Sequence, residues 1–182
     1  RMLGMVSVQN TTVDWQQHTG DIVLLPVGAM EQHGAHLPLE TDIQGATYFA
    51  IQLAQDLDAA LLPTLPFSSS LEHAGFRGSV TLRPETLMAL VRDIATEMEA
   101  QAFHILVIMN GHGGNFCLGP VVREWNRADR PLKILLVNWW EFTDPSLMEQ
   151  SGLDIHAGEF ESSLMLAISP QAVQMEKLPP SK

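Results

Sequence analysis

The sequence is poor in several residue types, and each shortage excludes a class of protein. Among 182 residues there is one cysteine, so Cys117 has no partner for an intramolecular disulfide and a cytoplasmic location is expected. Lysine and arginine number 10 against 21 aspartates and glutamates, giving a net charge of −11. This charge argues against a nucleic-acid backbone or an anionic membrane as partner. No apolar run approaches the roughly 18 residues that a membrane-spanning helix needs.

Apolar residues nevertheless make up 46% of the chain and are spread along it, which is enough for one packed domain. Three continuous apolar runs, over residues 21–27, 103–109 and 132–139, indicate strands that are buried on both faces. A further run, residues 59–67, contains Pro63 and Pro66 and predicts a short or irregular strand.

Helical spacing of apolar residues follows between these runs and predicts helices over 42–57, from Pro84 to about 102, up to about 128, and over 158–168. Thr41 or Asp42 is expected to cap the first helix, and Gly119-Pro120 to kink or delay the third. Residues 1–20 are weakly patterned, with a hint of a short helix at Asp14-Trp15. The alternation of strand, loop and helix predicts an α/β fold with a mainly parallel sheet.

Ionisable residues gather in two loops that each follow a predicted strand. The segment PVGAMEQHGAHLPLETD, residues 26–42, carries Glu31, His33 and Asp42, and NGHGGN, residues 110–115, carries His112. Both loops lie at the carboxyl edge of the predicted sheet, where function gathers in such folds. Imidazole and carboxylate ligands without thiolates suit Zn²⁺, Mn²⁺ or Fe²⁺. The sequence therefore predicts one metal site at Glu31, Asp42 and His112, with His33 available for a second site that shares Asp42.

A third segment, HAGEFE over residues 156–161, can reach the same edge of the sheet. His156 and Glu159 are three residues apart, so both can face the loops. Spacing alone leaves open whether Glu159 or Glu161 binds metal. In the two loops and the segment between them, His36 and Glu40 are expected to be scaffold, whereas for His73 structural and functional roles are equally balanced.

The motifs EQHGAHLPLETD, NGHGGN and HAGEFESS, in this order and joined by LEHAGFRGSVTL, resemble the creatininase (creatinine amidohydrolase) family over about residues 20–172. The resemblance implies a three-layer α/β/α sandwich and a single domain over residues 1–182 that ends earlier than most relatives. It also implies two divalent metal ions (Zn, Mn or Fe) and a homo-oligomer, usually a hexamer.

Residue by residue, the resemblance implies metal ligands at Glu31, His33, Asp42 and His112, with Asp42 bridging two ions. Glu159 is the expected fifth ligand. His156 corresponds to the catalytic histidine that shuttles a proton, and Glu161 to a nearby active-site carboxylate.

One departure bears on the substrate. Creatininase proper has a glutamate two residues after the NGH histidine, where this chain has Gly114, which argues against creatinine itself. The resemblance to NGHGGN/HAGE-type members implies an amidohydrolase that cleaves a C–N bond of a small substrate, such as a cyclic amide or a formamide, with a metal-activated water. Alternatives are a formamide hydrolase of flavin or deazaflavin biosynthesis, a small-peptide peptidase and, from another class, a metal-binding subunit without catalytic activity.

Overall fold

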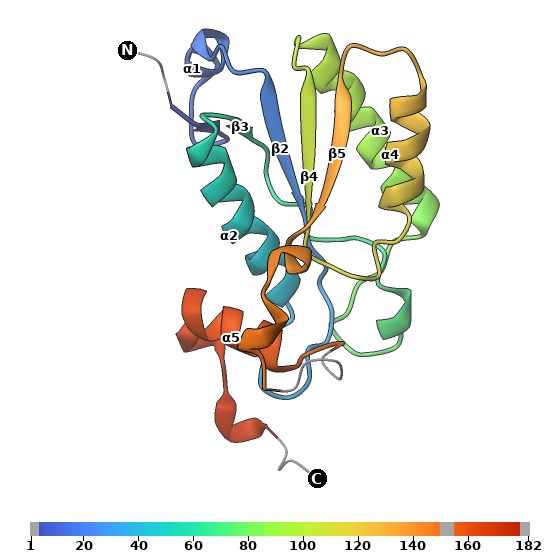
Figure 1. Cartoon of the computed structure of the whole chain (residues 1–182). Helices are drawn as coiled ribbons and strands as arrows, with labels where there is room; N and C mark the ends of the chain where they lie inside the picture. Colours follow the sequence, from blue (N-terminus) through green and yellow to red (C-terminus); the bar gives the residue numbers. More distant parts are fainter. Residues whose placement is uncertain (1–3, 150–154, 179–182) are drawn as a thin grey trace.

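A parallel β-sheet forms the centre of the computed structural model, which describes residues 4–149 and 155–178 (Figure 1). The sheet order is β1-β3-β2-β4-β5, and all pairs are parallel. The strands are β1 Val6–Ser7, β2 Ile22–Val27, β3 Ala60–Leu61, β4 Ile105–Asn110 and β5 Lys133–Asn138. The helices of the described residues are α1 Thr12–Gln17, α2 Thr41–Asp56, α3 Pro84–Ala100, α4 Leu118–Arg127 and α5 Glu159–Ile168.

The central strands are apolar on both sides because helices cover both faces of the sheet. Side chains alternate along a strand, so in β4 Leu106 and Ile108 enter one core cluster while Val107 and Met109 enter the other. The part of the core that contains Leu106 and Ile108 lies under α3 and α4, and the part that contains Val107 and Met109 lies under α2. The continuous apolar runs of β2 and β4 follow directly from this double burial.

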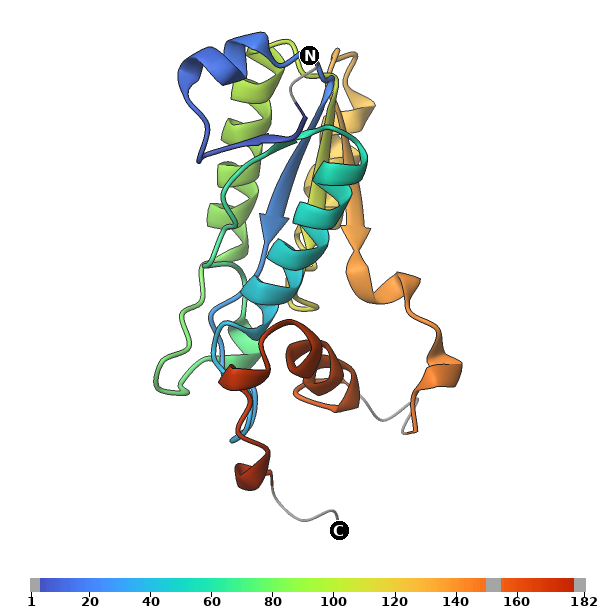
Figure 2. The same cartoon turned by 90° about the vertical axis from the view of Figure 1, so that its left-hand side faces the viewer.

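The helices form two layers with the sheet between them, which confirms the predicted three-layer architecture. Figures 1 and 2 show α3 and α4 on one side of the sheet and α2 on the other. Helix α5 packs against α2 and lies beyond the end of the sheet toward which β5 points (Figure 2). In this position α5 reaches the loops that leave the carboxyl ends of the strands.

The predicted elements lie within a few residues of the observed ones, with three differences. The two-residue strand β1 was not predicted, because two residues carry no periodicity. Helix α2 has Glu40 at its N-cap with no side-chain cap, so neither Thr41 nor Asp42 caps it. Helix α4 begins at Leu118, which places Pro120 in its first turn, where the missing N–H costs nothing.

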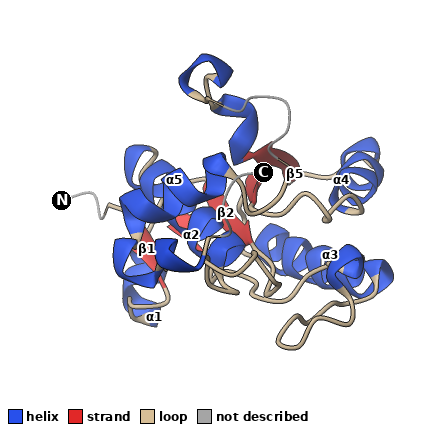
Figure 3. Cartoon of the chain, turned by 90° about the horizontal axis from the view of Figure 1, so that it is seen from below, coloured by secondary structure: helices blue, strands red, loops and turns tan. Residues whose placement is uncertain are grey.

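The segment predicted as a loop over 140–157 contains short 3₁₀ turns at Trp139–Phe142 and Pro145–Leu147, and its residues 150–154 lie outside the described part. The helices of the described residues include none long and apolar enough to cross a membrane. Seen from below (Figure 3), the loops lie between α5 and α3 at the carboxyl end of the sheet. The candidate site is built there.

Candidate metal centre

Two glycines bring the start of α2 against the ends of β2 and β4. A Cβ on Gly28 would lie 2.6 Å from the Cα of Ile43, and one on Gly111 would lie 2.5 Å from the carbonyl oxygen of Asp42. Both obstacles are backbone, so only glycine allows this approach. Asp42, in the first turn of α2, is thereby held between the two loops.

The NGHGGN loop is fixed by its two asparagines. The Oδ1 of Asn110, at the end of β4, accepts from the backbone N–H of His112 at 3.2 Å and from the Nδ2 of Asn115 at 3.0 Å. Asn115 in turn accepts from the N–H of Ser69 at 3.2 Å. The polar residues of this motif thus hold the loop that presents His112, and they link it to the segment after β3.

The first cluster consists of Glu31, Asp42 and His112, whose ligand atoms all lie within 4.8 Å of one another. His112 Nδ1 is 3.1 Å from Asp42 Oδ2, and His112 Nε2 is 3.2 Å from Glu31 Oε2. The three residues are at most 5% exposed. Within the described part of the chain, Glu31 Oε1, Asp42 Oδ2 and His112 Nε2 are buried without a hydrogen bond. Buried polar atoms are normally satisfied, so this convergence fits a cation.

The second cluster consists of His33, Asp42 and Glu161. His33 Nε2 lies 3.1 Å from Asp42 Oδ1 and 3.7 Å from Glu161 Oε1. Asp42 therefore offers one oxygen to each cluster, as a bridging carboxylate would. The Nδ1 of His33 donates to the carbonyl oxygen of Glu31 at 3.2 Å, which turns Nε2 toward Asp42 and Glu161. This is the usual way in which a protein orients a histidine that binds metal.

Glu159 and Glu161 occupy different environments at the start of α5. Glu161 reaches His33, and its Oε2 accepts from the N–H of Ala157 at 2.5 Å. Glu159 Oε1 instead accepts from the N–H of Glu149 at 2.9 Å. The sequence left Glu159 and Glu161 as alternatives; Glu161 lies with His33 and Asp42 in the second cluster, and Glu159 contacts Glu149.

The charges of the two clusters are strongly coupled. Burial opposes protonation of His33 and His112, but contacts with Asp42, and with Glu161 and Glu31 respectively, outweigh it and raise the pKa of each ring to about 10. Burial would raise the pKa of Asp42, yet its contacts with His112 and His33 lower it. Without a cation, protonated imidazoles therefore balance the buried carboxylates, and a divalent cation can replace those protons.

His156 lies beside both clusters. Its Nδ1 is 3.7 Å from Glu31 Oε1, and its ring is tilted by 40° against that of His33 with a centroid separation of 4.5 Å. Its Nε2 is 2.7 Å from the carbonyl oxygen of Gln32. The same Nε2 is 3.0 Å from the side-chain amide nitrogen of Gln32, so Gln32 holds this edge of the ring and Nδ1 faces the carboxylate of Glu31.

Four further residues contact the clusters without having been assigned a role from the sequence. Ser70 donates to Glu31 Oε2, and Gln32 contacts His73 Nδ1 at 2.9 Å. His73 stacks on His156 with centroids 4.2 Å apart and places Nε2 3.4 Å from Glu31 Oε1. Glu72 Oε1 lies 3.3 Å from His112 Nε2. Glu72 and His73 both lie in the segment LEHAGFRGSVTL, but the sequence did not single out Glu72, and these contacts depend on the folded loop.

The expected scaffold role of His36 agrees with its contacts. Its Nε2 lies 2.8 Å from the hydroxyl of Ser162 on α5, and its carbonyl oxygen accepts from the N–H of Gln174 at 2.8 Å. His36 thereby ties the loop after β2 to α5 and the segment that follows it. Glu40 is exposed at the N-terminus of α2 and accepts from the side chain of Gln44.

Comparisons with known proteins agree with this geometry. The family described as "Creatininase: Creatinine amidohydrolase" matches residues 9–182. Creatinine amidohydrolase from Pseudomonas putida is 34% identical over 179 residues, covering 87% of this chain and 69% of the relative. Mycofactocin precursor peptide peptidase from Mycolicibacterium smegmatis is 34% identical over 164 residues, covering 86% of this chain and 62% of the relative. This chain thus spans about two thirds of the length of these relatives.

Solved structures give the same result. A crystal structure of creatinine amidohydrolase (creatininase) superposes with a TM-score of 0.82 at 30% identity, covering 97% of this chain and 77% of the other. Related creatininase structures include one described as a Zn–Zn type, with a TM-score of 0.78, and one described as the Mn form, with a TM-score of 0.80. Sequence and fold agree, and the chain belongs to the creatininase family.

Proposed function

We propose that the protein is a metal-dependent hydrolase that cleaves a C–N bond of a small amide, with two divalent cations held at its two clusters. The observation that carries the proposal is the convergence of two histidines and three carboxylates from three distant segments. One of these carboxylates, Asp42, offers one oxygen to each cluster. Among the described residues, buried carboxylate and imidazole atoms of the first cluster have no hydrogen bond, which supports cation binding rather than a purely structural hydrogen-bond network.

The donor set supports Zn²⁺, Mn²⁺ or Fe²⁺. Glu31, Asp42 and His112 would hold one ion, and His33, Asp42 and Glu161 the other. Imidazole and carboxylate together are typical ligands of these metals, and the creatininases of known structure include Zn and Mn forms. Bound cations of this kind lower the pKa of water and polarise a carbonyl group.

His156 is the residue that would move a proton. Its Nε2 contacts the carbonyl oxygen and the side-chain amide of Gln32, while Nδ1 faces Glu31, so Nδ1 is the nitrogen that would accept a proton from water and return it to the leaving nitrogen. Such a positioned acid–base group contributes typically ~10²- to 10⁴-fold to a rate. The presence of His156 beside both clusters supports a catalytic protein over a metal-binding subunit without turnover.

The substrate class is an amide with an accessible carbonyl. Relatives named creatinine amidohydrolase and mycofactocin precursor peptide peptidase act on different compounds by their names, and creatinine itself is disfavoured by Gly114. A small amide or formamide is our first candidate and a short peptide the second. Assays with creatinine, small formamides, cyclic amides and short peptides distinguish these substrates.

The test of the proposal combines metal analysis with that panel. The purified protein is expected to contain about two equivalents of a divalent metal and to lose both metal and hydrolysis in Asp42→Asn. Full hydrolysis by Asp42→Asn, or hydrolysis that persists after complete metal removal, would overturn the proposal.

A cytoplasmic location and a homo-oligomeric state complete the proposal. The single cysteine supports the first. Exposed apolar side chains, among them Leu135 at 51%, Phe142 at 77% and Leu147 at 81%, support the second. Light scattering on the purified protein measures the number of subunits, and a monomer at micromolar concentration would contradict this part.

A further inference from the structure

A carboxylate outside both clusters lies against the first one. Glu72, in the turn Leu71–His73, places Oε1 3.3 Å from Nε2 of His112. The same nitrogen faces Glu31 Oε2 at 3.2 Å, so His112 lies between a fully buried carboxylate and a partly exposed one. The side chain of Glu72 is 45% exposed and that of His112 6%. Glu72 therefore approaches the first cluster from the solvent side.

Gly114 makes room for this approach. A Cβ at position 114 would lie 2.1 Å from Glu72 Oε1 and 2.3 Å from His112 Nε2, whereas a Cβ on the neighbouring Gly113 would meet nothing within 4 Å. The φ of Gly114 is outside the left-handed region, so the backbone does not require glycine there. Space for Glu72 and His112 is the physical reason for glycine at this position.

The position of Glu72 over Gly114 is fixed by the surrounding loops. The Oδ1 of Asn115, next to Gly114, accepts from the N–H of Ser69 at 3.2 Å, and the carbonyl oxygen of Ser70 accepts from the N–H of His73 at 3.2 Å. Ser69 and Ser70 are fully buried. The loop that carries Glu72 and the loop that carries His112 are thereby joined by a hydrogen bond three residues from each partner of the contact.

We propose that Glu72 is a positioning residue of the first metal cluster, that its carboxylate occupies the space of a side chain at position 114, and that Gly114 is required for this arrangement. The inference rests on the proposed metal-binding function. Glu72 keeps the ring of His112 oriented toward Glu31 and Asp42, and it adds negative charge at the entrance of the cluster. Groups that orient a metal-binding histidine typically contribute ~10- to 100-fold to metal affinity.

The experiment measures Zn²⁺ affinity of the full chain by competition with a chelator, and the visible spectrum of the Co²⁺ form, which reports coordination geometry. Glu72→Gln is expected to weaken affinity about 10-fold and to change the Co²⁺ spectrum. Gly114→Ala is expected to have the same effects, because its Cβ displaces both partners. The double variant is expected to lose little more than either single variant, since both changes remove one contact.

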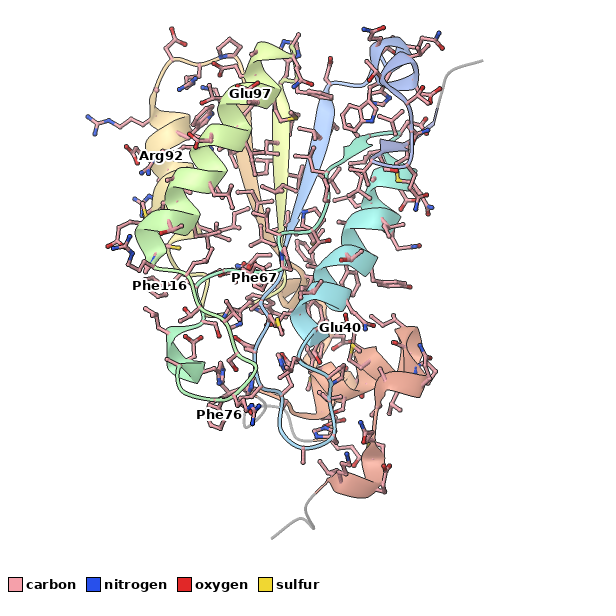
Figure 4. The ribbon with its side chains drawn as sticks, turned by 180° about the vertical axis from the view of Figure 1, so that it is seen from behind. Glu40, Phe67, Phe76, Arg92, Glu97 and Phe116 are labelled. Carbon is pink, nitrogen blue, oxygen red and sulfur yellow. The ribbon has the colours of Figure 1, made fainter. Side chains whose placement is uncertain are left out.

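Two matched controls separate this effect from charge and from loop chemistry. Glu97→Gln removes the same charge at the far end of α3 (Figure 4), and Gly113→Ala adds the same methyl group to open space. Both should bind Zn²⁺ like the wild type. The urea midpoint of metal-free Glu72→Gln should also match that of the wild type, because the carboxylate is partly exposed.

Each outcome has one meaning. Wild-type affinity and an unchanged Co²⁺ spectrum in Glu72→Gln overturn this inference alone and leave the proposed function standing. Additive losses in the double variant show that Gly114 acts separately from Glu72 and overturn the shared arrangement. Failure of the wild-type protein to bind Zn²⁺ or Co²⁺ overturns the proposed function and this inference together.

Discussion

The Nε2 of His156 lies 2.7 Å from the carbonyl oxygen of Gln32 and 3.0 Å from its side-chain nitrogen, so the residue between Glu31 and His33 also fixes the ring that would shuttle the proton. Replacing this histidine should remove acid–base catalysis and spare the metal. His156→Gln is expected to lower kcat by roughly 10²- to 10⁴-fold with unchanged metal content, measured by elemental analysis and the amide panel.

His104→Gln is the matched control, because His104 is exposed beside Asp21 at the amino end of β4. Its kcat and metal content should equal those of the wild type. A loss of metal in His156→Gln would instead identify His156 as a ligand, in line with its position beside Glu31 and His33.

Replacing Glu159 and replacing Glu161, the two acidic residues at the start of α5, should affect the metal content of the protein differently. Glu161→Gln is expected to keep about one equivalent of metal, because the cluster of Glu31, Asp42 and His112 stays complete. Glu159→Gln should keep the full amount, since its carboxylate accepts from Glu149. Elemental analysis of both variants measures the difference. The reverse pattern would restore Glu159 as the ligand.

The metal-free protein should lose stability as the pH rises. The folded pKa of His33 and His112 is about 10, above the ordinary value of 6.5. Protonation therefore stabilises the folded state fully below pH 6.5, and this contribution is lost as the pH rises to about 10. The thermal midpoint of chelator-treated protein, measured between pH 6.5 and 9.5, should fall.

Metal binding should show the opposite dependence, because a cation must displace those protons. Zn²⁺ affinity should rise over the same pH interval, and calorimetry in buffers of different ionisation enthalpy should detect proton release. A thermal midpoint of the metal-free protein that rises with pH, or metal binding without proton release, would contradict the charge state described for the two clusters.

Gly111, one of the two glycines that allow α2 to approach the strand ends, should affect the stability of the protein independently of metal. Gly111→Ala places a methyl group 2.5 Å from the backbone of Asp42 and 2.9 Å from the Cβ of Ala46, and it should destabilise the protein by about 1–3 kcal/mol. Urea unfolding of metal-free protein measures this change.

Gly119→Ala is the control in α4, where an added Cβ meets nothing within 4 Å. It should leave the free energy of unfolding within about 0.5 kcal/mol of the wild type, because the better helix propensity of alanine is offset by the proline that follows at position 120. Equal effects of the two substitutions would show that the approach of α2 to the β4 loop is not tight.

Much of the fold could be predicted because the composition of the central strands reflects their burial on both faces of the sheet. The runs that contain Leu106 and Val107 are apolar without alternation, and only burial on both faces produces this pattern. Strand β1 was missed because Val6 and Ser7 form too short a segment for any periodicity. The cap of α2 was wrong because Asp42 uses its carboxylate for His33 and His112.

The residues of the candidate site could likewise be predicted only in part. Glu31, His33, Asp42 and His112 could be proposed because parallel strands bring their carboxyl ends to one edge. Glu159 and Glu161 could not be distinguished by spacing, although residues two apart on a helix lie about 200° apart and only one can face the clusters. The contact between Glu72 and His112 depends on two loops meeting, and no local pattern encodes it.

The division of the site among segments also sets an order of assembly. Glu31, Asp42 and His112 lie in the first two thirds of the chain, on elements that β2 and β4 join directly. The second cluster also includes Glu161, which lies on α5 and is synthesised later than the residues of the first cluster. During synthesis from the amino end, the chain therefore completes one cation-binding position before the other has all its ligands.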